Sequence, residues 1–533
     1  MKKWLLRIGG SIIGIVLLLS FWVLWNLRDR HPGYEVDMNI KSVYTPGTIK
    51  VGFAAFPITP EIVDTWNDVN GDAKYRPKDG DSYNDNNNNG KFDAFWIAGF
   101  SNQRAANGVH DDVWARVVAF DDGETRLVLV SLDAIGFRHD DVVDIRKMIP
   151  VNAKIDYAII SSTHTHESND LIGIWGESPF KSGVNREHMQ YVKNQAVAAI
   201  TQASNNLRPA KLLFAQDLTG AKDMVMDTRE PVVMDPGLRL MQAIDAETDS
   251  TLGTLVAWAN HPETLWSDNL LISSDFPHYV RQCVEKGVYD GDSLVMPGVG
   301  GTAVYINGAI GGLMTTRASM ALTDPFLDTT YTEASFEKAK AQGQRLAMLA
   351  LNALNKPDTL VEKVNLSVQA RTITLPLDNK MFRLAAMLGV LDFGMTGWFK
   401  TRTEIAAFTL GPASFLSIPG EIYPEIVNGG IESPAGQDYE LDPIEIPPLR
   451  TLMPGKYKFI IGLSNDEIGY IVPKSQWDVE APYTYNRVDA PYGEENSIGP
   501  ETSPILYREI QKILNELQTM ESVVESQSYQ SDE

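Results

Sequence analysis

Residues 126–166 have the sequence RLVLVSLDAIGFRHDDVVDIRKMIPVNAKIDYAIISSTHTH, and this stretch decides the fold class. Residues 126–131 and 157–162 are short aliphatic runs, which predict buried strands. Between them, residues 139–148 repeat apolar side chains at helical spacing, which predicts a helix. Strands that alternate with helices are typical of an α/β protein whose helices cover a sheet.

The same alternation continues outward from this stretch. Further strands are predicted at 51–56, 211–215, 238–244, 253–259, 303–306 and 364–375, and a second strand-rich half is predicted through 406–418 and 456–462. Further helices are predicted at 185–206, 277–286, 335–355 and 503–520. We therefore expect one large mixed-sheet α/β domain with covering helices at 51–520. A linker at 29–50 precedes this domain, and residues 521–533 are expected to form a disordered acidic tail.

The composition is that of a folded protein without an internal disulfide. Of 533 residues, 44% are hydrophobic and 22% charged, close to globular averages. The net charge of -23 disfavours nucleic acid and anionic lipid headgroups as partners through general electrostatics. Cys283 is the only cysteine, so a metal site must use histidine, carboxylate or phenol ligands.

The first 28 residues predict a membrane anchor. Three basic residues precede an apolar stretch at 8–27, which is long enough to cross a bilayer as a helix. Trp22 and Trp25 lie near its end and no small-x-small cleavage site follows, which favours a retained anchor over a cleaved signal peptide. A buried core helix fits this terminal position poorly. We expect a single-pass membrane protein with its body outside the cytoplasm.

Residues 64–93 are rich in Asp, Asn and Gly and suggest a calcium loop. The alternating ligand positions of such a loop are filled by Asp85, Asn87, Asn89, the Lys91 carbonyl and Asp93. Gly90 stands at the sharp turn, but Trp96 occupies the place of the bidentate glutamate, so the segment is not an EF-hand. A shortened structural Ca²⁺ loop and a solvated Asn-Gly turn both remain open, and an exported setting slightly favours the loop.

Two histidines follow the predicted strand at 157–162. His164 and His166 are two residues apart, so both imidazoles point to one face if the strand continues. Ligand sites form at strand ends in α/β sheets, and paired imidazoles suit a divalent cation. The alternative is a turn whose histidines are satisfied by local hydrogen bonds.

Three other hydrophobic runs end at residues that can bind a metal. His261, Glu421 and Tyr470 each follow such a run. A metal site at the edge of a sheet requires several strand ends that each present a ligand, and these four strand ends each present a possible one. Walker, GxGxxG, GxSxG and HExxH motifs do not occur in a supporting context, which excludes the commonest nucleotide-binding, serine-hydrolase and zincin classes.

From residue 51 to about 501, the chain resembles the catalytic domain of the neutral/alkaline non-lysosomal ceramidases. The similarity lies in short blocks in the right order: the Trp96 to Phe120 block, Thr-His-Thr-His at 163–166, the strand ending in His261, Pro-Gly-Glu at 419–421 and Gly-Leu-Ser-Asn at 462–465, followed by Tyr470. The resemblance implies a zinc ion bound by His164, His261, Glu421 and Tyr470. It also implies that His166 faces the reacting carbonyl.

Two departures from the family affect the expected chemistry. The family's Gly-Asp-Val-Ser-Pro block is most similar to residues 308–315, which puts Met314 at the position of the active-site serine and leaves Thr315 pointing elsewhere. Residues 167–170 are Glu-Ser-Asn-Asp instead of the usual Ser-Gly-Pro continuation, which is expected to alter the pocket rim. Met314 is therefore assigned to the substrate pocket, and Arg229 either faces the site or is an exposed loop arginine.

The expected function is zinc-dependent hydrolysis of an N-acyl amide by attack of zinc-bound water, with His166 or Tyr470 stabilising the oxyanion. The expected substrate is a small lipid or N-acyl amide, such as a ceramide-like lipid beside the membrane that holds the N-terminal helix. Two alternatives stay open. One is hydrolysis of a different amide or ester, and the other is a catalytically silent binding protein that keeps its metal.

Overall fold

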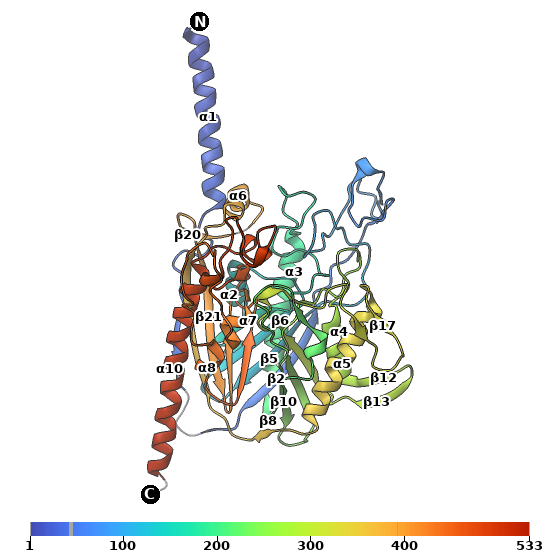
Figure 1. Ribbon diagram of the computed structural model, residues 1–533, viewed down its shortest axis with the longest axis vertical. Helices are drawn as coiled ribbons and strands as arrows, with labels where there is room; N and C mark the ends of the chain where they lie inside the picture. Colours follow the sequence, from blue (N-terminus) through green and yellow to red (C-terminus); the bar gives the residue numbers. More distant parts are fainter. Residues whose placement is uncertain (1, 42–45, 392, 532–533) are drawn as a thin grey trace.

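The computed structural model describes residues 2–41, 46–391 and 393–531. Two large β-sheets form the body, helices cover them, and one long helix projects from the body at the N-terminus (Figure 1). The predicted α/β class with mixed sheets and covering helices is confirmed.

The larger sheet has nine strands in the order β14-β11-β10-β8-β2-β5-β6-β7, with β18 beside β8. Most neighbours are antiparallel, whereas β6 with β7 and β11 with β14 are parallel. The strands are β2 (Lys50–Pro57), β5 (Trp114–Asp121), β6 (Arg126–Leu132), β7 (Tyr157–Ser162), β8 (Arg208–Asp217), β10 (Leu238–Asp245), β11 (Thr251–Ala257), β14 (Thr302–Ile306) and β18 (Thr359–Val361).

The second sheet has six strands in the order β1-β19-β21-β22-β24, with β20 beside β21. Its strands are β1 (Asp37–Ile40), β19 (Leu366–Pro376), β20 (Met395–Gly397), β21 (Lys400–Leu410), β22 (Ala413–Ser417) and β24 (Tyr457–Ile461). The strand-rich stretch predicted at 406–418 contains the end of β21 and all of β22, because the chain turns at Gly411 with φ of 56° and forms the hairpin β21–β22. The linker predicted at 29–50 also contains β1, which pairs with β19.

Side chains from both sheets share one apolar core. Phe120 of β5 lies 6.3 Å from Phe408 of β21, and Phe408 stacks on Phe415 of β22 at 4.3 Å between ring centroids. All three rings are fully buried. This packing fixes the ends of the two sheets relative to one another.

The helices pack on the faces and ends of the sheets. They are α2 (His139–Met148), α3 (Arg186–Asn205), α4 (Phe276–Lys286), α5 (Phe336–Leu354), α6 (Lys380–Leu388), α7 (Pro424–Asn428), α8 (Leu449–Leu452), α9 (Tyr492–Glu495) and α10 (Thr502–Ser531). Some of these helices have a side-chain N-cap. Asn185 accepts hydrogen bonds from the first turn of α3, and Ser335 does so for α5. Helix α10 continues through residues 521–531, where a disordered tail was expected; glutamate and glutamine favour helix there.

Short strand pairs occur in the connections. They are β3 (Thr65–Asn67) with β4 (Ser82–Asn84), β9 (Met226–Asp227) with β15 (Met314–Thr315), β12 (Gly287–Asp290) with β13 (Ser293–Pro297), β16 (Leu322–Thr323) with β17 (Thr330–Tyr331), and β23 (Glu421–Ile422) with β25 (Tyr470–Ile471). Two of these pairs, β9–β15 and β23–β25, lie beside the candidate site described below.

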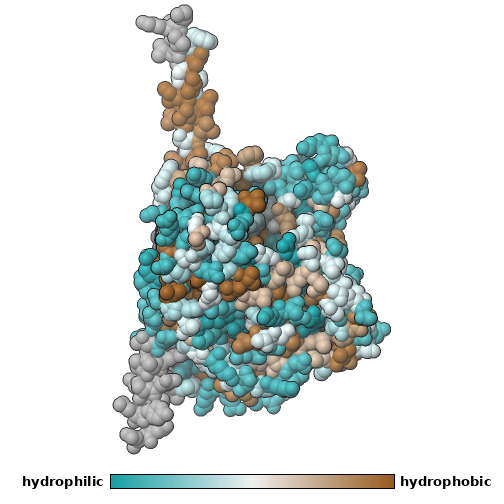
Figure 2. Space-filling model, in the orientation of Figure 1, coloured by the Kyte–Doolittle hydropathy of each residue, from teal (hydrophilic) through white to brown (hydrophobic). Residues whose placement is uncertain are grey.

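Helix α1 (Lys2–Asn26) is long and apolar enough to cross a membrane. It projects away from the body, and apolar side chains cover its surface (Figures 1 and 2). Its base is attached to the body: Leu27 is buried in the core, and Asn26 Nδ2 donates a hydrogen bond to the Met387 carbonyl at 2.9 Å. Membrane insertion and the side on which the body lies remain predictions.

Candidate metal centre

His164 lies just beyond the end of β7, in a strained backbone conformation. The strand ends at Ser162, and His164 has φ of +67°, so the condition that the strand continues through both histidines is not met. The rings of His164 and His166 nevertheless lie 4.9 Å apart between centroids. Residues other than glycine seldom adopt this left-handed backbone conformation, and those that do concentrate at functional sites.

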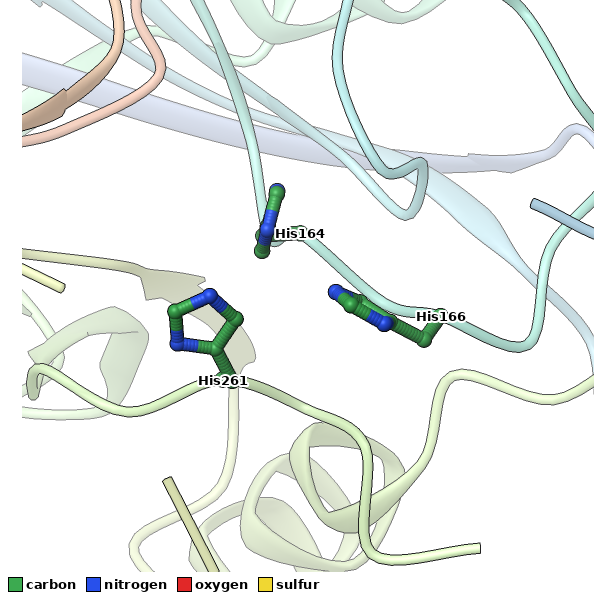
Figure 3. Close-up of side chains that lie close together, drawn as sticks. All are labelled: His164, His166 and His261. Atoms are coloured by element: carbon green, nitrogen blue, oxygen red, sulfur yellow. The ribbon is translucent and has the colours of Figure 1, made fainter. Parts of the chain in front are cut away.

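His261 approaches the same point from the loop after β11. Its backbone N–H donates to the Met314 carbonyl at 2.9 Å, which fixes the loop against β15. The His261 ring lies 4.9 Å from His164 and 5.7 Å from His166 between centroids. The three buried histidines point toward one another (Figure 3), and one ligand nitrogen from each lies within 4.8 Å of the other two. They can hold a metal ion.

Backbone carbonyls orient two of these rings for metal binding. His164 Nδ1 lies 2.5 Å from the Ile135 carbonyl, and His261 Nδ1 lies 2.7 Å from the Met314 carbonyl. A carbonyl only accepts, so each Nδ1 carries the hydrogen and each Nε2 is directed at the site. His164 Nε2 presents a lone pair, whereas His261 Nε2 donates to the Glu421 carboxylate, a proton that a bound cation would replace. Both ring nitrogens of His166 are buried without a hydrogen-bond partner among the described residues. Such orphaned atoms indicate a site for an additional group.

Glu421 and Tyr470 reach the histidines from the end of the six-stranded sheet. They are paired residues on the parallel strands β23 and β25. Glu421 Oε2 lies 3.0 Å from His261 Nε2 and 3.5 Å from His164 Nε2. The Tyr470 hydroxyl lies 3.4 Å from His261 Nε2. The structure therefore brings together the four residues that the family resemblance implies as ligands, and their nitrogen and oxygen atoms are of the kinds that bind a metal ion.

Burial and Glu421 set the protonation of the cluster. Burial lowers the pKa of His164 to about 4 and that of His166 well below its usual range, so both rings are neutral near pH 7. Burial acts in the same direction on His261, but its hydrogen bond to Glu421 and the charges of Glu263 and Glu421 together outweigh burial and raise the pKa to about 9. For Glu421, His164 and His261 outweigh burial and lower the pKa. The site thus holds a buried carboxylate that favours a cation.

Comparison with solved structures identifies this architecture. The chain is similar to a neutral ceramidase from Pseudomonas aeruginosa, with a TM-score of 0.62 and 14% identity over 89% of this chain and 75% of that one. The chain has the neutral ceramidase fold. A ceramidase complexed with C2 is similar to the same extent, with a TM-score of 0.61, 14% identity and the same coverage of 89% and 75%. No protein-family model and no curated protein matches the sequence.

Within the neutral ceramidase fold, the position assigned to Met314 needs correction. Met314 and Thr315 are successive residues of β15, so their side chains point to opposite faces. Met314 is fully buried in an apolar cluster with Trp258 and does not line the cavity beside the histidines. The Thr315 hydroxyl, expected to point elsewhere, donates a hydrogen bond to buried Glu263.

Glu263 is a site residue that sequence reasoning missed. Its Oε2 lies 3.6 Å from His166 Nδ1, and burial raises the pKa of its carboxyl group. The signal was its position two residues after His261, which places both side chains near the same loop.

Arg104 and Glu167 were also missed as residues that hold the His166 loop. Fully buried Arg104 donates hydrogen bonds to the carbonyls of His166 and Ala98 and contacts Glu167 at 3.2 Å. Burial raises the pKa of Glu167 to about 8 although Arg104 opposes this shift. Glu167 is fully buried, so it does not alter the pocket rim as expected.

Arg229 is neither exposed nor in the cavity. It is buried, pairs with Glu494 and lies over the Tyr423 ring at 4.7 Å from its centroid. The expectation of an exposed loop arginine is therefore wrong. Arg229 instead joins its own loop to α9.

A largely apolar cavity leads to the histidines. His164, His166, Glu421 and Tyr470 share it with Arg138 and Glu467. Its apolar walls are formed by Ile135, Ile172, Ile174, Trp175, Phe382, Leu391, Phe393 and Ile468. A few polar groups at one point of an apolar cavity suit a ligand that has both a polar centre and an apolar chain.

The Asp/Asn-rich segment forms a separate exposed loop. Asp85 accepts hydrogen bonds from the backbone N–H groups of Asn89 and Gly90, and the side-chain amides of Asn87 and Asn89 donate to Asp93 at 2.7 and 2.6 Å. Gly90 has φ of +75°, as the expected turn requires. Calcium binding by this loop, including the Lys91 carbonyl, stays a prediction.

Proposed function

We propose that this chain is a zinc-dependent hydrolase of an N-acyl amide, with a ceramide-like lipid as the favoured substrate. The observation that carries the proposal is the convergence of His164, His166 and His261 with Glu421 at the end of an apolar cavity. The neutral ceramidase fold supports the reaction class.

The proposed zinc ligands are the Nε2 atoms of His164 and His261, the Glu421 carboxylate and the Tyr470 hydroxyl. His166 offers a further nitrogen to the same point. A bound zinc ion supplies a Lewis acid that polarises a carbonyl and lowers the pKa of water.

The chain's own residues position the substrate and move protons. The neutral imidazole of His166 has no hydrogen-bond partner among the described residues, so its ring nitrogens are available to donate to the substrate carbonyl or to accept a proton. Glu263 lies beside His166 Nδ1, and Thr315 holds the Glu263 carboxylate in place. Glu263 and Thr315 thereby orient the His166 imidazole, as a carboxylate beside a histidine does in metal sites. The apolar walls hold an acyl chain and exclude water from the reacting carbonyl.

Turnover of purified full-length protein tests the proposal. Release of fatty acid is measured from detergent-solubilised ceramide, from simpler N-acyl amides and from matching esters. We expect amide hydrolysis that His164→Ala and His166→Ala abolish, while His110→Ala, a partly exposed histidine outside the cluster, behaves as wild type. Preferential hydrolysis of esters would favour the alternative substrate class. A fully metallated protein that hydrolyses none of them would instead be a silent binding protein.

A further inference from the structure

Three apolar side chains are exposed at the foot of α1. Met381 and Leu384 on α6 are 69% and 40% exposed, and Trp398, between β20 and β21, is 76% exposed. We call these three residues the α6 surface. Trp398 contacts Phe399 at 4.8 Å between ring centroids, and Arg383 of α6 lies over the Phe399 ring, so the three side chains belong to neighbouring segments.

The α6 surface adjoins the end of the predicted membrane anchor. Helix α6 lies at the base of α1 (Figure 1), and the bond from Asn26 to the Met387 carbonyl joins the two helices. Trp25, at the same end of α1, is exposed, and Arg28 lies over its ring. Tryptophan and arginine at the end of an apolar helix are typical of the membrane–water interface. The interface plane set by α1 therefore passes close to α6.

The other face of α6 contributes to the cavity. Phe382 lines the cavity together with His164, His166 and Leu391, and Ala386 is buried. One short helix thus has an exposed apolar face beside the anchor and an inner face beside the candidate reaction centre.

We propose that the α6 surface inserts into the bilayer that holds α1, so that the apolar cavity receives its substrate laterally from the lipid. The choice of a lipid substrate rests on the proposed function. The insertion itself rests on the position of three exposed apolar side chains beside α1. A short amphipathic helix with Trp or Leu on one face lies in the headgroup region in this way.

The charge around the α6 surface supports a membrane partner. Although the whole chain carries -23, the described residues of the two segments at this end include the cations Arg28, Arg30, Lys380, Arg383 and Lys400 and the anions Asp29 and Asp378. Asp29 pairs with Arg402 at 2.9 Å, and Asp378 pairs with Arg383 at 2.7 Å. Basic side chains beside an apolar face are favourable at a phospholipid surface.

Depth of insertion can be measured without any catalytic assay. Full-length protein with Leu384→Cys is labelled with an environment-sensitive fluorophore and reconstituted into phosphatidylcholine vesicles, with and without phosphatidylglycerol, that contain nitroxide lipids. The control is Leu294→Cys on β13, which is 52% exposed and lies away from α1. The native Cys283 is buried and resists labelling. We expect a blue shift and several-fold stronger quenching at position 384; equal quenching at both positions would overturn the proposal.

Substrate delivery gives the second readout. The triple variant Met381→Ser, Leu384→Ser, Trp398→Ser should hydrolyse vesicle-embedded substrate about 10-fold more slowly than wild type and detergent-solubilised substrate at the same rate. The matched control, Leu294→Ser, Val295→Ser, Leu327→Ser, removes three exposed apolar side chains elsewhere and should leave both rates unchanged. Equal loss on both substrates would overturn lateral delivery. Quenching without hydrolysis would refute the proposed function and leave the insertion intact.

Discussion

At the scale of single residues, Met314 and Thr315 are neighbours with opposite surroundings. Thr315→Val removes the hydroxyl that holds Glu263 beside His166, so kcat should fall about 10-fold or more, with only a small change in stability. Met314→Ser places a hydroxyl in the apolar core and should destabilise the protein by about 2–4 kcal/mol without raising the rate of ceramide hydrolysis above that of the wild type. Steady-state kinetics and urea unfolding of both variants measure these effects. Faster ceramide hydrolysis by Met314→Ser than by the wild type would contradict this placement of β15.

Gly99 contacts the His166 ring so closely that no side chain fits between them. A Cβ atom at position 99 would lie 2.6 Å from the imidazole, and the backbone has φ of +109°. Gly99→Ala should displace His166 and lower kcat by about 10²-fold while the metal content stays unchanged. Gly123→Ala is the matched control, because it imposes similar backbone strain at φ of +98° with nothing within 4 Å of the new Cβ. Equal activity of the two variants would show that the position of His166 does not limit the reaction.

At the scale of elements, one ion pair attaches α4 to the strand layer. Arg281 donates two hydrogen bonds to Asp133, just after β6, at 2.7 and 2.8 Å, and both side chains are buried. Arg281→Ala leaves a buried carboxylate unpaired and should cost about 3–5 kcal/mol in the free energy of unfolding. Arg345→Ala on α5 breaks a more exposed pair with Asp223 and should cost under about 1 kcal/mol. Urea unfolding distinguishes the two, and similar losses would refute the structural role of Arg281.

Sequence predicted the regular elements best where their pattern is local. The helix at 139–148 and the strand at 157–162 coincide with α2 and β7, because each is a continuous apolar pattern between turn residues. The sequence did not predict β1, which becomes a strand only by pairing with β19, more than three hundred residues away in the chain.

In the candidate site, too, the residues marked by a local sequence pattern were predicted and those defined by long-range contacts were not. His164, His261, Glu421 and Tyr470 each follow a hydrophobic run, so the sequence predicts them as ligands. Glu263 and Arg104 act through contacts with Thr315 and the His166 loop, which are 52 and 62 residues away. No local pattern marks such contacts. Met314 was misplaced because an offset of one residue in a strand exchanges the two faces.

At the scale of the whole molecule, a buried carboxyl group links stability to pH. Burial raises the pKa of Glu425 on α7 to about 8, so the folded protein binds more protons than the unfolded chain between about pH 4.5 and pH 8. Its contribution therefore favours folding at low pH and is lost as pH rises through this window. Glu425→Gln should flatten the decline of unfolding free energy between pH 5.5 and 8, as measured by urea unfolding at each pH. An unchanged slope would show that Glu425 is not buried as described.

The two sheets meet at a point where their strand ends present ligands from segments that span three hundred residues of the chain. A metal at this point links the sheets, so its removal should lower the stability of the entire body. We expect chelation of the purified protein to lower the unfolding midpoint by several degrees, because a tightly bound ion contributes about 3–4 kcal/mol by mass action. An unfolding midpoint that chelator leaves unchanged would show that a metal at this site does not stabilise the fold.

Metal analysis by mass spectrometry of full-length protein tests the central claim most directly. We predict about one zinc ion per chain in the wild type. His164→Ala with His261→Ala should lose it, while His110→Ala should retain it. A natively folded wild type without bound metal, or a double variant that keeps its zinc, would contradict the metal centre proposed at His164, His261, Glu421 and Tyr470.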